Sequence, residues 1–199
     1  LINIQNLSAQ DLPKGPTEQE KLMMQSYIPP VSPFAFTQPP AVPVRTMAEW
    51  EELQGVMITW TSQTTILRQI VDYVQDECMV YIVCSDSNSV KNTLTSNGIP
   101  LTNITFMVAP FNSIWIRDYG PWSVYANNTD SLYIVDWIYN RPRPNDDNVP
   151  VVFATRRNIP IYQTTVSPYN LTATGGNFMV DGHGTGFSSK LILNENTSK

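Results

Sequence analysis

The strongest constraint on the fold is a regular alternation of short apolar runs with helical patterns between residues 55 and 108. Three runs are rich in β-branched and aromatic residues, as strands are: 55–60, 79–84 and 104–108. Between them, residues 64–76 repeat apolar side chains at helical spacing, and a second helix is expected from Asp86 or Ser87 to about Ser96. Strand, helix, strand, helix, strand predicts a layered α/β unit.

The order of elements recurs from Ser123 onward, although no exact sequence repeat accompanies it. We expect a helix over 149–158. We also expect strands over three segments: 131–138, 161–165 and 191–193. The sequence therefore predicts two related α/β modules.

The first part of the chain, residues 1–45, differs in composition because it holds half of the prolines: Pro13, Pro16, Pro29, Pro30, Pro33, Pro39, Pro40 and Pro43. Proline fixes φ and lacks an N–H donor, which argues against a regular helix or a central strand. We predict an extended arm over 1–45, anchored by Tyr27, Phe34 and Phe36, followed by a folded α/β region over 46–199.

Charge and composition exclude several classes of function. The formal net charge is -5 and no run of Lys or Arg is present, so nucleic acid and anionic membranes are not expected partners. No apolar run reaches the ~18 residues of a membrane span. The two cysteines, Cys78 and Cys84, are interpreted as buried free thiols, and no zinc signature occurs beside the single histidine.

The first segment with chemical character is 113–122, in which Arg117 and Asp118 lie between Trp115 and Trp122. Charges beside indoles suggest a pocket mouth, since apolar walls strengthen electrostatic contacts. A carboxylate can hold a guanidinium through two hydrogen bonds, and an indole can cover its face. The ordinary alternative is a structural ion pair between Arg117 and Asp118.

The second segment is 136–147, where arginines and prolines alternate around Arg141 and Arg143. In an extended chain, alternate residues point the same way, so two guanidinium groups could grip one carboxylate. The alternative is a solvated loop whose arginines pair with Asp146 and Asp147. These two carboxylates and Asn148 could also bind a structural calcium ion, although we expect no cofactor or catalytic metal.

The third segment is the glycine-rich stretch 174–186. Glycine lets the backbone approach a ligand closely or turn with a positive φ. The stretch does not match a phosphate-binding loop, because it lacks the lysine and the glycine spacing of such loops. Asp181 would attract a cation, and His183, flanked by glycines, is expected to be exposed rather than catalytic.

Taken in order, WxRDxG, DxIYNRPRPND and TGGNxMxDG resemble the bacterial peptidylarginine deiminase family of the Porphyromonas type. The resemblance begins near Val44 and runs to the end of the chain. Agmatine deiminases share the first and third elements but lack the paired arginines. The resemblance implies a pentein fold, an α/β propeller around a central active site, of which this chain supplies roughly the first two modules.

The resemblance also implies roles for individual residues. Trp115 is similar to the tryptophan that lines the guanidinium slot, and Asp118 to the catalytic-site carboxylate that binds both guanidinium nitrogens. Arg141 and Arg143 are similar to the pair that binds the carboxylate of a carboxy-terminal arginine. Asp181 is similar to a supporting carboxylate that faces the site.

The implied reaction is attack of a cysteine thiolate on the guanidinium carbon, loss of ammonia, and hydrolysis of a thiouronium intermediate to citrulline. The family's nucleophilic Cys and its His-x-Asp lie further along the chain than the third motif, so we expect these 199 residues alone to be inactive. We also expect processing near Lys199 and a companion chain that carries the C-terminal half. Secretion or placement at the bacterial surface follows from the same resemblance.

Two other functions stay open from the sequence. One is a deiminase acting on agmatine or another small guanidine, which the paired arginines disfavour because agmatine has no carboxylate. The other is a non-catalytic module that binds arginine without converting it.

Overall fold

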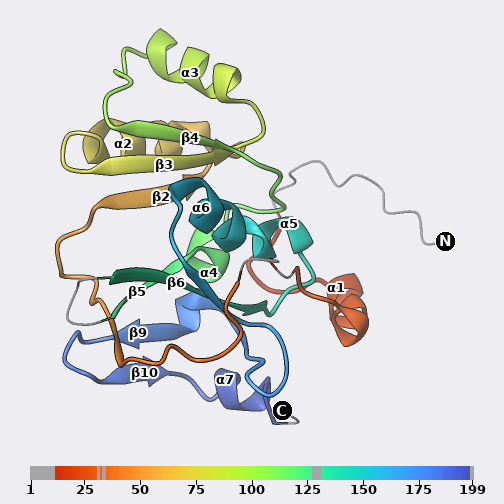
Figure 1. Cartoon of the computed structure of the whole chain (residues 1–199). Coiled ribbons are helices and arrows are strands. Elements are labelled where there is room, and N and C mark those ends of the chain that lie inside the picture. Colours follow the sequence, from red (N-terminus) through yellow and green to blue (C-terminus); the bar gives the residue numbers. More distant parts are fainter. Residues whose placement is uncertain (1–11, 31, 33–34, 127–130, 198–199) are drawn as a thin grey trace. The chain divides into compact units, whose positions relative to one another are not determined.

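The computed structural model describes residues 12–30, 32, 35–126 and 131–197, and the chain divides into two compact units (Figure 1). The described part of unit 1 comprises 12–14 and 52–116. Unit 2 comprises Gly15–Glu51 and Arg117–Lys199, less the gaps just given.

Unit 1 is a three-stranded parallel sheet with two helices. The strands follow the order β2 (Gly55–Thr59), β3 (Met79–Cys84), β4 (Ile104–Val108), and the helices are α2 (Thr64–Val74) and α3 (Ser87–Ser96). All five elements confirm the sequence predictions, with ends that differ by at most two residues. The Asp86 side chain accepts a hydrogen bond from the backbone N–H of Asn88, so this residue caps α3 as its position predicted.

The core of unit 1 explains why these segments form these elements. Alternate residues of β3, Val80, Ile82 and Cys84, are buried in one cluster with Leu67 of α2 and Leu94 of α3. Both helices therefore cover the same face of the sheet, and each buries a stripe of apolar side chains at helical spacing. Cys78 and Cys84 are both free thiols, but only Cys84 is buried as expected, since Cys78 is partly exposed.

Unit 2 is built on a mixed five-stranded sheet. Its strands follow the order β1 (Val44–Thr46), β5 (Trp122–Ala126), β6 (Ser131–Tyr139), β7 (Ile161–Thr164), and β8 (Thr172–Ala173) also pairs with β6. β5 runs antiparallel to both β1 and β6, whereas β7 and β8 both run parallel to β6. The central strand is therefore β6, and the second motif lies at its carboxyl end.

Helices complete this part of unit 2. The short helix α4 (Ile116–Tyr119) precedes β5, and α5 (Pro144–Asp147) and α6 (Val149–Arg157) link β6 to β7. Ala154 of α6 packs on Ile134 and Ile161 of the sheet. Asn158 ends α6 in the left-handed conformation that asparagine tolerates. The predicted strands 131–138 and 161–165 and the predicted helix 149–158 are confirmed.

The proline-rich segment contains a short helix, which the sequence prediction excluded. α1 (Glu18–Met23) and the 3-10 turn η1 (Met24–Ser26) lie between Pro16 and Pro29. Thr17 and Glu20 form a capping box at its start, so two of the N–H groups at this helix end are bonded by the segment's own side chains. Proline at the flanks is compatible with a helix of this length. Phe34 lies outside the described residues.

The third motif and the C-terminal segment also differ from expectation. The motif forms a 3-10 turn η3 (Gly175–Asn177) and then a hairpin of β9 (Phe178–Val180) and β10 (Gly186–Ser188). The expected strand at 191–193 is wrong, because α7 (Leu191–Asn194) is helical, with the Asn194 N–H bonded to the Lys190 carbonyl. A run of three apolar residues does not by itself distinguish a strand from a helical turn.

Within the described part of the chain, no helix combines the length and the apolar character that a membrane span requires.

Candidate functional site

Strand pairing brings the second and third motifs together in unit 2. β6 and β8 are parallel neighbours, with Tyr139 opposite Ala173, so both strands end at the same edge of the sheet. Asn140 and Arg141 continue from β6, and Gly175 follows β8 within two residues. Ligands in α/β proteins commonly bind at the carboxyl ends of parallel strands.

The first motif reaches the same edge through a close backbone contact. A Cβ at Gly175 would lie under 3.0 Å from the carbonyl oxygen of Arg117 and 3.4 Å from the indole of Trp137. Only glycine fits between them. The glycine-rich sequence suggested a close approach to a ligand, whereas Gly175 packs closely against the backbone of Arg117 within unit 2.

Asp118 is buried, with 4% of its surface exposed. Among the described residues, its carboxylate makes no hydrogen bond and no ion pair. Burying a carboxylate without a partner is unfavourable. Asp136 and Asp147, which are equally buried in unit 2, both accept hydrogen bonds, from Gln163 and from Tyr27. Asp118 is therefore a buried acidic residue with no hydrogen bond or ion pair to another described residue, as a carboxylate that binds a ligand could be.

The Arg117–Asp118 ion pair, the ordinary alternative for this motif, is not what the structure contains. The guanidinium of Arg117 forms an ion pair with Glu49 instead and lies over the Trp122 ring, 5.7 Å from its centroid. Trp122 also packs against Phe178 of β9, at 5.3 Å between centroids. The tryptophan that follows the motif is thus a packing residue that joins α4 to the hairpin.

Tyr139, the last residue of β6, is a candidate site residue that the sequence interpretation missed. It is 1% exposed, its ring contacts Tyr119 edge-on at 5.8 Å, and its hydroxyl has no hydrogen-bond partner among the described residues. Burial is the main cause that raises the pKa of this phenol, and the charges of Asp118, Arg141 and Arg143 act on it as well. The charges of three predicted substrate-binding residues therefore act on one buried phenol.

The signal that could have located Tyr139 is its position. It stands between the apolar residues of β6 and the polar segment 140–147, where a strand side chain at the sheet edge meets polar neighbours. Its aromatic character hid it, because tyrosine is expected in strands in any case.

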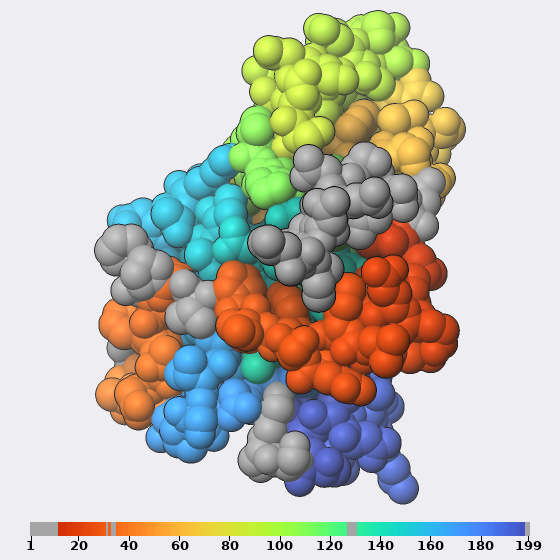
Figure 2. Space-filling model, turned by 90° about the vertical axis from the view of Figure 1, so that its right-hand side faces the viewer, coloured from red at the N-terminus to blue at the C-terminus, as the bar shows by residue number. Residues whose placement is uncertain are grey.

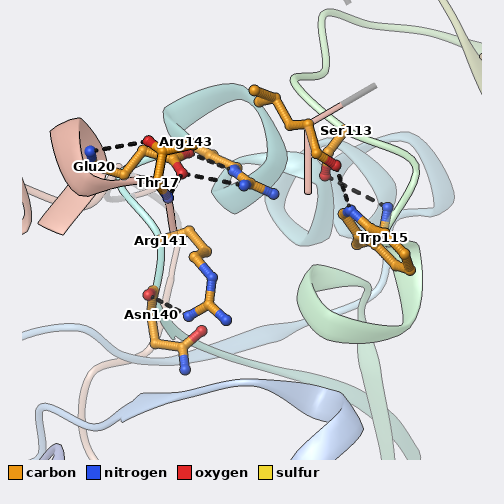
Figure 3. Close-up of polar contacts among 8 residues, drawn as sticks. Thr17, Glu20, Ser113, Trp115, Asn140, Arg141 and Arg143 are labelled. Carbon is orange, nitrogen blue, oxygen red and sulfur yellow. Dashed lines mark hydrogen bonds and ion pairs between the residues drawn. The ribbon is translucent and has the colours of Figure 1, made fainter. Parts of the chain in front are cut away.

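Arg141 and Arg143 do not lie in an extended chain, contrary to expectation. The N–H of Arg143 donates to the carbonyl of Arg141 at 2.8 Å, so the chain turns there. Arg141 is half-buried and donates to the carbonyl of Asn140 at 2.8 Å, whereas Arg143 is 2% exposed (Figure 3). The two guanidinium groups thus have different surroundings and are not equivalent parts of one clamp.

Arg143 has a carboxylate partner that no sequence pattern indicated. Its Nε donates to Glu20 Oε1 at 2.6 Å and its Nη2 to Glu20 Oε2 at 3.2 Å (Figure 3). Glu20 belongs to α1, 123 residues away. Burial opposes ionisation of Glu20, but hydrogen bonds from Arg143 and Thr17 outweigh it and lower the pKa of this carboxyl. The pair is therefore ionised.

Asp181 lies in the turn between β9 and β10. Its Oδ1 accepts the N–H groups of His183 at 2.7 Å and Thr185 at 3.0 Å, and these bonds lower its pKa. Its carbonyl accepts the indole N–H of Trp50. Gly182 and Gly184 adopt positive φ in this turn, as glycines there allow. The predicted role of Asp181 toward substrate stays a prediction.

His183 is exposed, as expected, and stacks on Trp50 at 5.7 Å between ring centroids. Trp115 belongs to unit 1 and is half-buried. Its indole N–H donates to the carbonyl of Leu12 at 2.8 Å, and its backbone N–H contacts Ser113 Oγ at 3.4 Å (Figure 3). The indole polar atom is thus occupied by a backbone oxygen from the N-terminal segment.

The carboxylates proposed for calcium, Asp146 and Asp147, are both buried in α5. Asp147 accepts the Tyr27 hydroxyl at 2.6 Å and the Tyr139 N–H at 2.8 Å, one on each oxygen. Desolvation raises the pKa of Asp147 to about 7 despite these bonds. Within the described ranges, no three His, Cys, Asp or Glu side chains gather as metal ligands would. The calcium site stays a prediction.

Comparison with known proteins places these features in a family. The family model described as Porphyromonas-type peptidyl-arginine deiminase matches residues 45–199. The structure of C. jejuni agmatine deiminase is similar, with 21% identity and a TM-score of 0.63 over 77% of this chain and 48% of that one. A Porphyromonas gingivalis structure assigned as an arginine deiminase has 18% identity and a TM-score of 0.65, over 77% of this chain and 49% of that one.

The chain thus spans about half the length of the solved structures that it matches. At these identities, the structural likeness establishes a shared mixed α/β fold. The family match covers most of the chain and includes all three motifs. The chain therefore belongs to the Porphyromonas-type peptidyl-arginine deiminase family.

Proposed function

We propose that the protein containing this chain is a protein-arginine deiminase, and that unit 2 binds the arginine side chain of its substrate. The observation that carries the proposal is Asp118, a buried carboxylate without a partner among the described residues. A guanidinium is the cation that such a carboxylate binds best, because two parallel N–H donors match its two oxygens. Family membership supports the same ligand.

Binding by Asp118 would position the guanidinium carbon for attack. The cost of moving the cation out of water is offset by the carboxylate, which is itself already desolvated. Tyr139 is suited to a second polar contact, since its hydroxyl lacks a partner in the described structure. Trp115 as the residue that covers the guanidinium face stays a prediction from the family resemblance.

The groups that break the C–N bond are proposed to come from outside this chain. Unit 2 contains no cysteine, and its histidine, His183, is exposed and stacked on Trp50. Asp118, Tyr139, Arg141 and Asp181 can bind and orient, but none supplies a thiolate. We therefore propose a companion segment with a nucleophilic Cys and a His-x-Asp, and a pentein propeller in which this chain provides about two modules.

Peptidyl arginine is favoured over agmatine by the arginines that follow β6. Arg141 is half-buried at the sheet edge that ends in Tyr139, and its charge acts on the same phenol as that of Asp118. A cation at this place suits a ligand with a carboxylate near its guanidinium, as a carboxy-terminal arginine has. Agmatine has no carboxylate.

The test is citrulline formation by the full-length protein on three substrates: a peptide that ends in arginine, a peptide with internal arginine, and agmatine. We expect the fastest conversion of the first peptide. Fastest release of ammonia from agmatine would instead assign a small-guanidine deiminase. Binding of the peptides without any citrulline would assign a non-catalytic arginine-binding module.

A further inference from the structure

We propose that Glu20 is a specificity-determining residue, whose carboxylate occupies the place on Arg143 that a substrate carboxylate would take. The inference rests on the proposed function and extends it. It assigns the N-terminal segment, which lies outside the three motifs, a direct effect on which arginine substrates bind.

The geometry is that of a bound carboxylate. Glu20 presents one oxygen to Nε and the other to Nη2 of Arg143, at 2.6 Å and 3.2 Å. This arrangement uses one whole edge of the guanidinium, so a second carboxylate cannot make the same two bonds while Glu20 stays. The side chain of Arg143 is 1% exposed and that of Glu20 is 11% exposed. The contact is thus shielded from water, and charge-assisted hydrogen bonds are strong in such a shielded place.

Local structure holds Glu20 ready for this contact. In the capping box, the Thr17 N–H donates to Glu20 Oε2 at 2.8 Å, and the Glu20 N–H donates to Thr17 Oγ1 at 3.2 Å. Glu20 Oε2 therefore accepts from both Thr17 and Arg143. Because the carboxylate is oriented by its own helix, little side-chain entropy is lost when it meets the guanidinium.

Three more contacts hold the residues that follow α1 against the rest of unit 2. The Tyr27 hydroxyl donates to Asp147 at 2.6 Å, and the Ser32 N–H donates to Gln163 at 2.8 Å. Phe36 forms a parallel bridge to Tyr162 of β7. In Figure 2 the segment, red to orange, crosses the surface of the molecule. All three anchors follow α1 in the sequence, and the bond from Tyr27 to Asp147 ties the chain after α1 to α5.

A consequence for substrate choice follows from the charges. With Glu20 in place, Arg143 is neutralised, and selection of a free carboxylate depends on Arg141. Substrates with a terminal carboxylate must compete with Glu20 for Arg143, whereas substrates whose arginine carboxyl is an amide do not. Glu20 therefore reduces the preference of the protein for a carboxy-terminal arginine.

The experiment measures binding to the full-length protein of two peptides that end in arginine, one with a free carboxylate and one amidated. In Glu20→Gln the carboxylate that competes for Arg143 is gone. Binding of the carboxylate peptide should therefore tighten by about tenfold or more. Binding of the amidated peptide should change less than about twofold, since no carboxylate competes. Glu18→Gln is the matched control, because Glu18 is on the same helix, exposed, and paired with Lys21.

Unchanged or equally weakened binding of both peptides in Glu20→Gln would overturn the proposal and leave the pair a structural one. If Glu20→Gln fails to fold, the same two peptides are measured on Thr17→Ala. This variant removes the side-chain half of the capping box that orients Glu20 but keeps the Glu20 carboxylate. A smaller gain for the carboxylate peptide alone supports the proposal, and no gain overturns it.

A second peptide pair that ends in norleucine, with and without the free carboxylate, separates this inference from the proposed function. Norleucine has no guanidinium. A gain for its carboxylate form in Glu20→Gln supports the role of Glu20 even if no citrulline is formed from any peptide. Citrulline formation without any carboxylate-dependent gain would overturn the role of Glu20 and keep the proposed function.

Discussion

The carbonyl oxygen of Arg117 lies against Gly175 so closely that no side chain fits between them. This contact joins the helix that carries Asp118 to the turn that follows β8. It also explains a sequence feature, since the first glycine of the TGGN stretch serves close packing rather than a positive φ. The position of Asp118 at the sheet edge therefore depends on Gly175, which lies 57 positions further along the chain.

Gly175→Ala should destabilise the protein and impair substrate binding together. The added Cβ would collide with backbone, which cannot rotate away, so we expect a loss of ~1–3 kcal/mol in the free energy of unfolding. Chemical denaturation measures this loss. Gly15→Ala is the control, since nothing lies within 4 Å of a Cβ there. Equal effects of the two substitutions would contradict the assigned contact.

Tyr139→Phe should separate binding from stability. Removal of a buried hydroxyl without a partner in the described structure leaves stability unchanged or higher, because the desolvation of that group is relieved. The ring contact with Tyr119 remains. If the hydroxyl contacts substrate, kcat/KM for peptidyl arginine falls about tenfold, the value of one hydrogen bond. A large loss of thermal stability with normal kcat/KM would show a purely structural residue.

Arg141→Ala should discriminate between substrates. A half-buried guanidinium that binds a carboxylate contributes ~1.5–3 kcal/mol, so KM for a peptide with a free terminal carboxylate should rise at least about tenfold. KM for the amidated peptide should change little. Arg156→Ala, on the exposed side of α6, removes the same charge elsewhere in unit 2 and serves as the control. An equal rise for both peptides would remove Arg141 from carboxylate recognition.

The stability of the protein should fall as pH rises from about 4 to about 7. Desolvation raises the pKa of Asp147 to about 7 in the folded state, while the unfolded chain titrates near ~4. Between these values the folded state holds a proton that the unfolded state releases, so the free energy of unfolding decreases with pH and levels off above. Burial raises the pKa of Asp136 as well, and this acts in the same direction.

Thermal melts across this range test the titration of Asp147. Asp147→Asn should reduce the slope of Tm against pH, and the exposed Asp72→Asn should not. Glu20 acts in the opposite direction and at lower pH. Its lowered pKa means that its contribution is present above ~4.5 and is lost as pH falls through the folded-state value. An Asp147→Asn protein with an undiminished slope would refute the assignment.

The fold of unit 1 was readable from hydrophobic periodicity alone. Its elements bury one continuous core, and the continuous apolar run of β3 and the helical spacing in α2 report that core directly. In unit 2 the same signals located β6, α6 and β7. They missed α1, whose stability comes from the Thr17–Glu20 capping box rather than from an apolar face. They also assigned a strand at 191–193, where apolar residues alone do not distinguish a strand from a helical turn.

The candidate site was readable in residue type but not in geometry. The motifs identified Asp118, Arg141 and Arg143 because charged residues beside aromatic and proline residues are unusual. That Arg143 is buried against Glu20, while Arg141 is half-buried, depends on a contact across 123 residues. No local pattern encodes such a pairing. Tyr139 was missed for the converse reason, since a tyrosine in a strand is unremarkable until the charges around it are known.

The most direct test of the proposed arginine site is Asp118→Asn in the full-length protein, with citrulline formation and Tm measured on the same sample. Asparagine keeps the shape but removes the buried negative charge. We predict that citrulline formation falls at least about hundredfold, as loss of a charged ligand contact implies, while Tm stays the same or rises because an unpaired charge is no longer buried. Normal citrulline formation with a lowered Tm would contradict the account, because Asp118 would then be structural.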